Sequence, residues 1–587
     1  MKPKEARPPR SPLVLAPALR QALRGYRWGD LRADVLAGLV VGVIALPLSM
    51  ALAVASGVAP QHGLYTAVVA GGVIALLGGS AVQVSGPTAA FVVLLAPVTA
   101  SYGLGGLATA SMVAGAILVG MGLARMGRLI EFIPYPVTTG FTAGIAIVIA
   151  TLQVKDLLGL PMESLPPTFV EKVMALASHA EGVSVPDLLV GLMTLAALLV
   201  MPRLTKRLPA ALVALPLAAV AGVLMAHFGG EAWAVDTIRT RFPQTDGVPR
   251  QLPALTLPWL LPGGDGRPLY ESLNFAAARA LLAAGLAIAM LGAIESLLSA
   301  VVADGMTDRR HDPDAELIAQ GAGNLAAPLF GGFAATGAIA RTATNVRAGA
   351  RSPIAAVVHA LFVLGAMLGL APLLGYIPMS AMAAMLLIVA WNMSELRHVA
   401  HVLRIAPRSD KLVLITCLTL TVAFDMVIAV SVGVVLAALL FMERMAELTN
   451  VRLIGAGHPE LPEPLPEGVL LYRVDGPLFF GAAQRAVSAL TTTQPAPRAV
   501  LIDLSSVPHM DATGLTAFDS VLRKLHAARA FVVIAGVQEQ PLRLMASAGW
   551  KHREWLVVWR KLEDGLALLR TLSDSDFAHV QDARRRG

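Results

Sequence analysis

Charged residues are scarce in this chain of 587 residues. Only 14% are Asp, Glu, Lys or Arg, against about 25% in soluble proteins. Hydrophobic residues make up 56%, and the mean hydropathy is +0.67. From residue 35 to residue 124 no charged side chain occurs at 90 consecutive positions, which is room for four crossings at about 20 residues each. The composition predicts an integral membrane protein and excludes a chain built only of soluble domains.

Cysteine is almost absent too, since Cys417 is the only one. This excludes a disulfide framework and a cysteine-based zinc site. The chain also lacks a Walker loop, an HExxH helix and a GxSxG elbow, so we expect neither an enzyme nor an ATP-driven pump. No metal, cofactor or catalytic residue is expected. The excess of 46 basic over 39 acidic residues does not indicate a nucleic-acid partner in so apolar a chain.

The apolar runs between charged breaks predict fourteen transmembrane segments within residues 34–445, after an N-terminal arm at 1–33. The predicted segments are 35–55, 64–78, 87–99, 105–124, 134–154, 186–201, 208–227, 276–301, 314–328, 336–347, 352–373, 376–393, 411–424 and 426–443.

Basic residues indicate the orientation, because cytoplasmic loops are enriched in Lys and Arg. Eight lie in the N-terminal arm, and others lie at every second junction, including Arg125, Arg203, Arg309, Arg351 and Arg404. The two long loops on the other side, about 156–185 and 228–275, have no such excess. Both termini are therefore predicted to be cytoplasmic.

The character of the chain changes after residue 445. Residues 457–468 read GHPELPEPLPEG, a stiff Pro-rich linker. Apolar runs at 469–474, 499–503 and 531–535 then alternate with amphipathic stretches near 481–493, 513–527 and 540–549. Strands alternating with helices predict a small cytoplasmic α/β domain over residues 469–575.

Two of the predicted segments are short and polar. They are GGSAVQVSGPTAAF (78–91) and GGFAATGAIARTATN (331–345), and they occupy the third and tenth places, equivalent positions in two halves of seven. Interrupted helices in equivalent halves indicate a transporter's binding site. Two helix N-termini meeting there suit an anion.

Arg341 lies within the second interrupted segment. The glycines of both segments are also compatible with close helix packing alone. An arginine at bilayer depth, however, costs a few kcal/mol or more and indicates a functional site. We therefore favour an anion site.

Several motifs resemble those of the sulfate permease (SulP) family of anion transporters with a C-terminal STAS domain. The motifs are GVAPQHGLYTA (57–67), VSGPTAAF (84–91), GAIES (292–296), DAELIAQGAGN (314–324), ARTATNVRAGA (340–350) and LIDLSSVPHMDATGL (501–515).

This resemblance implies seven-plus-seven inverted repeats (a UraA-like fold), divided into a mobile core and a gate, and an elevator-like motion of a homodimer. The runs IALPLSMALA (44–53) and AWNMSE (390–395) are similar to the bacterial DauA type. That similarity implies proton symport of C4-dicarboxylates such as succinate, fumarate and aspartate across the bacterial inner membrane.

The resemblance also implies an anion site between the two half-helix starts, flanked by the first and eighth spans. The residues it nominates are Ser85, Gly86, Thr88 and Ala89 on one side and Ala338, Ile339, Ala340 and Arg341 on the other.

The chain departs from the family pattern at three positions in or near this site. Leu48 and Leu52 line the first-span side, where many members have a Gln and an aromatic residue, and Ala340 replaces a common hydroxyl. These replacements weigh against sulfate or chloride. Glu295 on the eighth span is a candidate proton-coupling residue, because a carboxyl near a cavity can exchange a proton. A structural role for Glu295 stays open.

In the STAS motif, Asp511 and Thr513 lie in the loop that is phosphorylated on a serine in similar bacterial regulators. Ala512 replaces that serine, so we expect docking of a cytoplasmic protein partner rather than phosphorylation.

Two functions other than dicarboxylate symport stay open. One is transport of sulfate, bicarbonate or another inorganic anion, and the other is that of an anion-sensing membrane receptor.

Overall fold

The computed structural model describes residues 15–128, 134–162, 165–166, 168–205, 209–424, 426–447, 449–454, 458, 464–479, 498–528, 530–550 and 555–571. The start of the predicted arm, residues 457 and 459–463 of the predicted linker, and the helix expected near 481–493 lie outside these residues. The chain divides into two compact units, residues 1–434 and 435–587.

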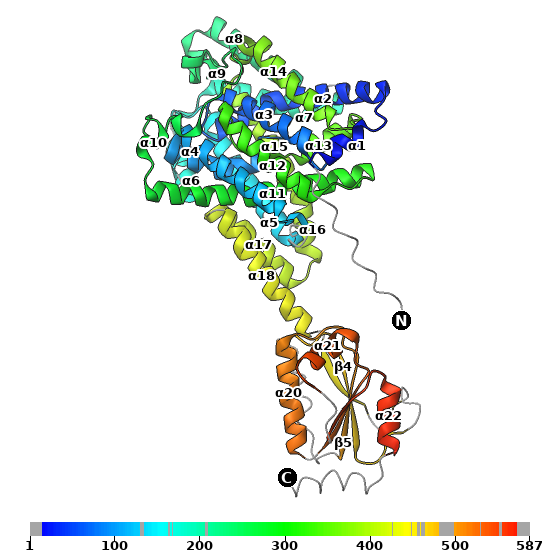
Figure 1. Ribbon diagram of the computed structural model, residues 1–587. Coiled ribbons are helices and arrows are strands. Elements are labelled where there is room, and N and C mark those ends of the chain that lie inside the picture. Colours follow the sequence, from blue (N-terminus) through cyan, green and yellow to red (C-terminus); the bar gives the residue numbers. More distant parts are fainter. Residues whose placement is uncertain are drawn as a thin grey trace. The chain divides into compact units, whose positions relative to one another are not determined.

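The first unit is almost entirely helical (Figure 1). Its N-terminal half comprises α1 (Pro17–Leu23), α2 (Trp28–Ala55), α3 (Pro60–Leu77), β1 (Ser85–Gly86), α4 (Ala89–Leu123), α5 (Tyr135–Leu157), α6 (Phe169–Ser178), α7 (Val185–Leu204) and α8 (Ala210–Gly229). After α9 (Ile238–Arg241) and α10 (Leu269–Ser272), the other half comprises α11 (Phe275–Thr307), α12 (Pro313–Ala326), β2 (Thr336–Gly337), α13 (Ile339–Arg347), α14 (Ile354–Leu374), α15 (Met379–Ser394), α16 (Leu396–Ile405), α17 (Arg408–Ala423) and α18 (Met426–Glu447).

Each of the fourteen predicted segments coincides with one of these helices or with part of one. The third and fourth form the single element α4, which is interrupted at Gly103. Gly103 has φ +64°, and a Cβ there would lie 2.4 Å from the carbonyl oxygen of Gly263, so glycine is required. Ten helices in the described part of the chain are long and apolar enough to span a membrane; a topology of fourteen crossings stays a prediction.

Helix packing falls into two groups. In one, α12 packs on α3 and α4, α11 on α4, and α14 on α2 and α3. In the other, α5 packs on α15 and α17, and α7 on α8 and α15. Each group combines helices from both halves of the sequence, as interdigitated repeats require.

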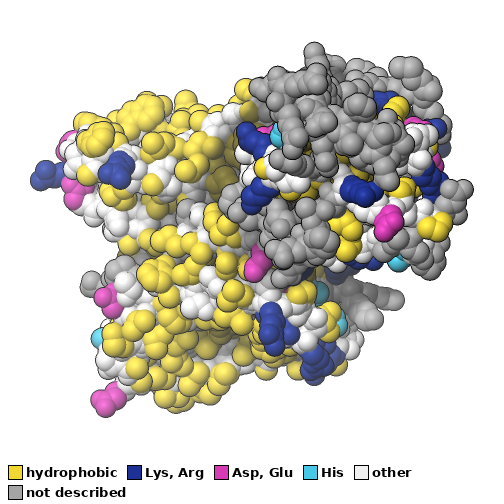
Figure 2. Space-filling view, turned by 90° about the horizontal axis from the view of Figure 1, so that it is seen from below, with side chains coloured by type: hydrophobic (Ala, Val, Ile, Leu, Met, Phe, Trp, Pro, Cys, Tyr) yellow, Lys and Arg dark blue, Asp and Glu magenta, His cyan; other side chains and the backbone are white. Residues whose placement is uncertain are grey.

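Apolar side chains also cover much of the outer surface of the helical unit (Figure 2). On α7 and α8 these include Leu192, Leu199, Leu217, Val220 and Leu224, each 46–56% exposed. Exposed apolar area of this extent marks a membrane-facing surface.

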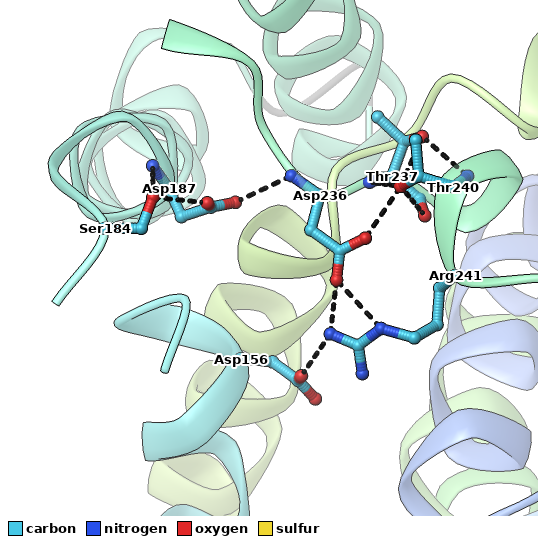
Figure 3. Close-up of polar contacts among 7 residues, drawn as sticks. All are labelled: Asp156, Ser184, Asp187, Asp236, Thr237, Thr240 and Arg241. Atoms are coloured by element: carbon cyan, nitrogen blue, oxygen red, sulfur yellow. Dashed lines mark hydrogen bonds and ion pairs between the residues drawn. The ribbon is translucent and has the colours of Figure 1, made fainter. Parts of the chain in front are cut away.

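An ionic network joins the segment after α8 to the helical unit (Figure 3). Arg241 forms ion pairs with Asp236 and, at 3.3 Å, with Asp156 at the end of α5. The backbone N–H of Asp236 donates to Asp187 on α7 at 3.2 Å, and its carbonyl accepts from Met379, the first residue of α15. The network thus connects the ends of three helices.

Arg241→Ala should lower the thermal unfolding midpoint of the purified protein. The substitution leaves the partly buried Asp156 and Asp236 without their cation, at a cost of about 2 kcal/mol. Arg543→Ala is the control, because Arg543 and Glu539 form an exposed pair on one helix, with side chains 59% and 71% exposed, and exposed pairs contribute about 0–1 kcal/mol. Equal midpoints for the two variants would contradict the stabilising role of the network.

The second unit contains a five-stranded sheet of order β3-β4-β5-β6-β7. β3 and β4 are antiparallel and the other neighbours are parallel. The elements after α18 are β3 (Asn450–Ile454), β4 (Val469–Asp475), β5 (Ala499–Ser506), α20 (Ala512–Ala527), β6 (Phe531–Ala535), α21 (Glu539–Ser547), β7 (Leu556–Val558) and α22 (Leu562–Thr571). Strand β3 was not predicted, and it precedes the predicted domain start at residue 469.

The two faces of this sheet are covered by different helices (Figure 1). Val500 and Ile502 of β5 pack with Phe518 of α20 and Met545 of α21. Leu501, between them, packs on the opposite face with α22. Alternate residues of a strand point to opposite faces, so the consecutive buried apolar residues 499–502 of β5 contribute to two cores.

Candidate functional site

The candidate site lies where the two interrupted segments cross. β1 and β2 pair antiparallel, with Ser85 opposite Gly337 and Gly86 opposite Thr336. Each strand leads into a helix, β1 into α4 and β2 into α13. Antiparallel pairing brings the two helix starts together from opposite directions, as expected of inverted repeats.

Neither helix start is capped by a side chain. The N-cap of α13 is Ala338, which has no polar group, and the N-cap of α4 is Thr88, whose side chain makes no capping hydrogen bond. The hydroxyl of Thr88 donates instead to Glu295 on α11, at 3.0 Å. The first N–H groups of a helix have no partner within it, so both starts offer donors to an anion.

Arg341 lies in the first turn of α13 and is only 3% exposed. Its Nη2 donates to the carbonyl oxygen of Pro87 in the other interrupted segment. Its Nε and Nη1 have no hydrogen-bond partner among the described residues. A Cβ at Gly86 would lie 2.6 Å from Nη1, so glycine at this position leaves room for the guanidinium group. A buried cation with two unused donors is suited to bind an anion.

Buried polar side chains of α12 form hydrogen bonds with the segment that contains β1. Gln320 on α12 donates to Ser85 and to Glu316, each at 2.9 Å. Glu316 also accepts from the backbone N–H groups of Gly79 and Ser80 at 2.9 and 3.2 Å. Glu316 is 1% exposed, so its role is structural and it is not a solvated charge. These bonds fix the segment that leads into β1.

The other interrupted segment is held in the same way. Thr342 accepts from the N–H of Val84 and from the hydroxyl of Ser299, both at 3.1 Å. Asn345 donates to the carbonyl of Val82 at 2.8 Å. These side chains therefore bind the backbone of the other interrupted segment, more than 250 residues away in the sequence.

The other residues predicted for the site differ in how far they are exposed. Ala89 is buried at the start of α4, whereas Ile339 and Ala340 are exposed at the start of α13. Leu48 and Leu52 lie on α2, which packs against α13. Leu52 is 1% exposed, and only Leu48 keeps exposed surface. The structure therefore brings the strand, helix-start and Glu295 residues together.

Sequence reasoning missed Gln83. This side chain is 5% exposed, and both of its amide atoms lack a partner among the described residues. Its Nε2 would lie 1.9 Å from a Cβ at Gly337 in β2. An uncharged polar residue between Val82 and Val84, two positions before Ser85, was the signal that could have identified it.

In the second unit, Asp511 is the N-cap of α20. Its side chain accepts from the N–H of Gly514 at 2.6 Å. Thr513 is exposed in the first turn of the same helix. Asp511 thus has a structural role in the loop, and Thr513 remains accessible. The described residues include no group of three or more His, Cys, Asp or Glu arranged to hold a metal ion.

Comparison with known proteins identifies the family. The profile of the sulfate permease family matches residues 31–417, and that of the STAS domain matches residues 463–564. The chain belongs to the sulfate permease family. As its family members are transporters, this protein is a multi-pass membrane transporter and not an enzyme.

Curated relatives in the sulfate permease family span nearly the whole chain. A putative sulfate transporter, YvdB, of Bacillus subtilis is 38% identical over 90% of this chain and 96% of its own length. The bicarbonate transporter BicA of Picosynechococcus is 30% identical over 88% of this chain and 90% of its own length.

Solved structures show the same architecture. The transmembrane domain of a cyanobacterial BicA is 28% identical, with a TM-score of 0.58 over 70% of this chain and 98% of its own. Murine Slc26a9 shares the fold at 17% identity, with a TM-score of 0.79 over 97% of both chains. The predicted fold class, a helical transporter followed by an α/β STAS domain, is confirmed.

Proposed function

We propose that this member of the sulfate permease family is a secondary transporter that binds a small anion between the starts of α4 and α13. The observation that carries the proposal is the meeting of two helix N-termini without side-chain caps beside the buried Arg341. Ser85, Gly86, Thr88 and Ala338 would form the rest of the site. The names of the relatives, which are sulfate and bicarbonate transporters, support an anion as the substrate.

The charge of the site favours a dianion loaded together with a proton. Each helix N-terminus contributes about half a positive charge, so the two starts and Arg341 supply about +2. An ionised Glu295 reduces this to about +1, and protonation of Glu295 restores it. We infer that Glu295 couples the proton to the anion through its contact with Thr88.

C4-dicarboxylates are the substrate class that we propose first, with symport of protons. Leu48 and Ala340 replace the polar residues expected in sulfate carriers, and a dicarboxylate matches a site of about +2. Sulfate and bicarbonate are the second candidates, because curated relatives at 38% and 30% identity carry those names.

The proposal also covers the movement, the oligomeric state and the orientation of the protein. An elevator-like movement would carry the group of α3, α4, α11 and α12 past the group of α5, α7 and α15. We propose a homodimer in the bacterial inner membrane with both termini in the cytoplasm, and a cytoplasmic protein partner for the STAS domain.

The direct test is uptake by the purified protein in liposomes. Labelled succinate, fumarate, aspartate, sulfate and bicarbonate are offered with and without an inward proton gradient. Accumulation of one of them driven by the gradient supports the proposal and ranks the substrates. Binding without any uptake would instead favour the anion-sensing receptor.

Glu295→Gln should abolish accumulation driven by a proton gradient while retaining exchange of substrate at equal pH. Glutamine keeps the hydrogen-bonding shape of a protonated carboxyl but cannot exchange a proton. Glu231→Gln, at an exposed position after α8, is the control and should behave as wild type. Intact accumulation in Glu295→Gln would assign Glu295 a structural role.

A further inference from the structure

A polar cavity of about 860 Å³ lies in the helical unit, and Arg341 is not among its lining residues. Four segments line it: α1 with the turn into α2 and the start of α2, residues 79–82, the end of α11 with the turn that follows, and residues 351–352. The apolar lining residues are small, apart from Tyr26. By the distribution of basic residues, these segments belong to the predicted cytoplasmic side.

The buried carboxylate of Asp34 holds three residues of the cavity lining in place. Its carboxylate accepts from the hydroxyl of Tyr26 at 2.6 Å, from the N–H of Arg351 at 2.6 Å, and from the N–H and hydroxyl of Ser352 at 3.1 and 2.5 Å. Burial and the bond to Asp34 raise the pKa of the Tyr26 hydroxyl to about 12. Tyr26 therefore lines the cavity as a neutral group.

Among the residues that line the cavity, arginines outnumber carboxylates. Arg24, Arg309, Arg310 and Arg351 line the cavity, with three carboxylates, those of Asp30, Asp304 and Asp308. Asp30 pairs with Arg351 at 2.6 Å, and Asp304 with His311 at 2.7 Å.

Two of the four arginines are especially available. Arg309 donates to the carbonyl of Arg351 at 2.8 Å. Within the described residues, the guanidinium groups of Arg24 and Arg310 have neither a hydrogen bond nor an ion pair, and both side chains are exposed. By formal charge, four arginines face three carboxylates in this lining, a net charge of +1 without His311.

We propose that this cavity binds a phosphate ester, either a soluble polyphosphate compound or the headgroup of an anionic phospholipid. Arginine forks match phosphate oxygens, and the volume falls in the range of about 300–1,000 Å³ usual for small-molecule sites. A sulfate or C4-dicarboxylate, with few heavy atoms, would fill only a small part of it. The ligand is therefore larger than the transported anion, and the site is separate from the transport site.

The position of the cavity links such a ligand to the transport machinery. Residues 79–82 lead directly into β1, and their backbone is held by Glu316 and Asn345. The end of α11 at Asp304 lies nine residues beyond Glu295 on the same helix. The ligand would join α1, α11 and the β1 segment, and so would stabilise one arrangement of these helices.

The test measures the thermal unfolding midpoint of the full-length protein in nanodiscs. In one arm, ATP is added to protein in phosphatidylcholine nanodiscs, as the soluble polyphosphate probe. In the other, phosphatidylglycerol replaces part of the phosphatidylcholine. A ligand that binds only the folded state raises the midpoint, so the arm in which it rises identifies the source of the phosphate.

The double variant Arg24→Gln, Arg310→Gln should lose that rise, with affinity for the effective probe weakened at least tenfold. Neither substitution breaks a described bond of a guanidinium group, so the midpoint without probe should stay unchanged. Arg203→Gln, at an exposed position on α7 outside the cavity, is the control and should retain the rise. No rise in either arm, or an equal rise in the double variant, would overturn the proposal.

Discussion

Arg341→Ala should weaken binding of the transported anion by roughly 100-fold or more in a protein that remains folded. Truncating one partner of a buried, hydrogen-bonded charge pair costs about 2–5 kcal/mol, and each 1.4 kcal/mol is tenfold in affinity. Arg341 is the only cation that the structure holds buried at the crossing of β1 and β2 within the described residues, and its Nε and Nη1 are unused. Calorimetric titration of the purified protein with the substrate found by the uptake panel measures the loss.

Two companion variants make this result specific. Arg341→Lys should restore only part of the affinity, because a point charge replaces a planar fork. Arg347→Ala removes an exposed arginine from the last turn of the same helix and should leave affinity unchanged. If the Arg341→Ala protein bound the substrate as tightly as wild type, the anion site would have to lie elsewhere.

Gly63→Ala should sharply lower the yield of folded protein and its thermal midpoint. A Cβ at Gly63 on α3 would lie 2.0 Å from the backbone oxygen of Ser49 on α2. Backbone cannot rotate away as a side chain can, so the two helices must separate along their contact. Overpacking of this kind costs about 1–3 kcal/mol, and more when backbone is involved. Size-exclusion chromatography with a thermal ramp measures both quantities.

Gly72→Ala is the matched control on the same helix. The nearest atom to a Cβ at Gly72 is Cβ of Ala360, at 3.9 Å, which is ordinary van der Waals contact. Alanine is favoured over glycine within a helix by about 1 kcal/mol, so this variant should be neutral or slightly stabilised. Similar midpoints for the two variants would show that close approach of α2 and α3 is not the reason for glycine at position 63.

The sequence alone was sufficient for the membrane class, the helical segments and the two interrupted segments. These follow from local properties, namely runs of apolar residues and breaks at glycine and proline. The same reasoning singled out Arg341 because a charge in an apolar run is visible without any partner. The family and its STAS domain were recognisable because their motifs are contiguous in the chain.

Tertiary structure decided what each polar residue contacts. Glu316 could be read as solvated until the fold placed it against Gly79 and Ser80. Thr88 and Glu295 are 207 residues apart in the chain and meet only because α4 and α11 pack together. Strand β3 gave no recognisable signal because five residues stand alone before a Pro-rich linker. Pairing between distant segments depends on packing of the whole unit, and no local pattern of residues encodes it.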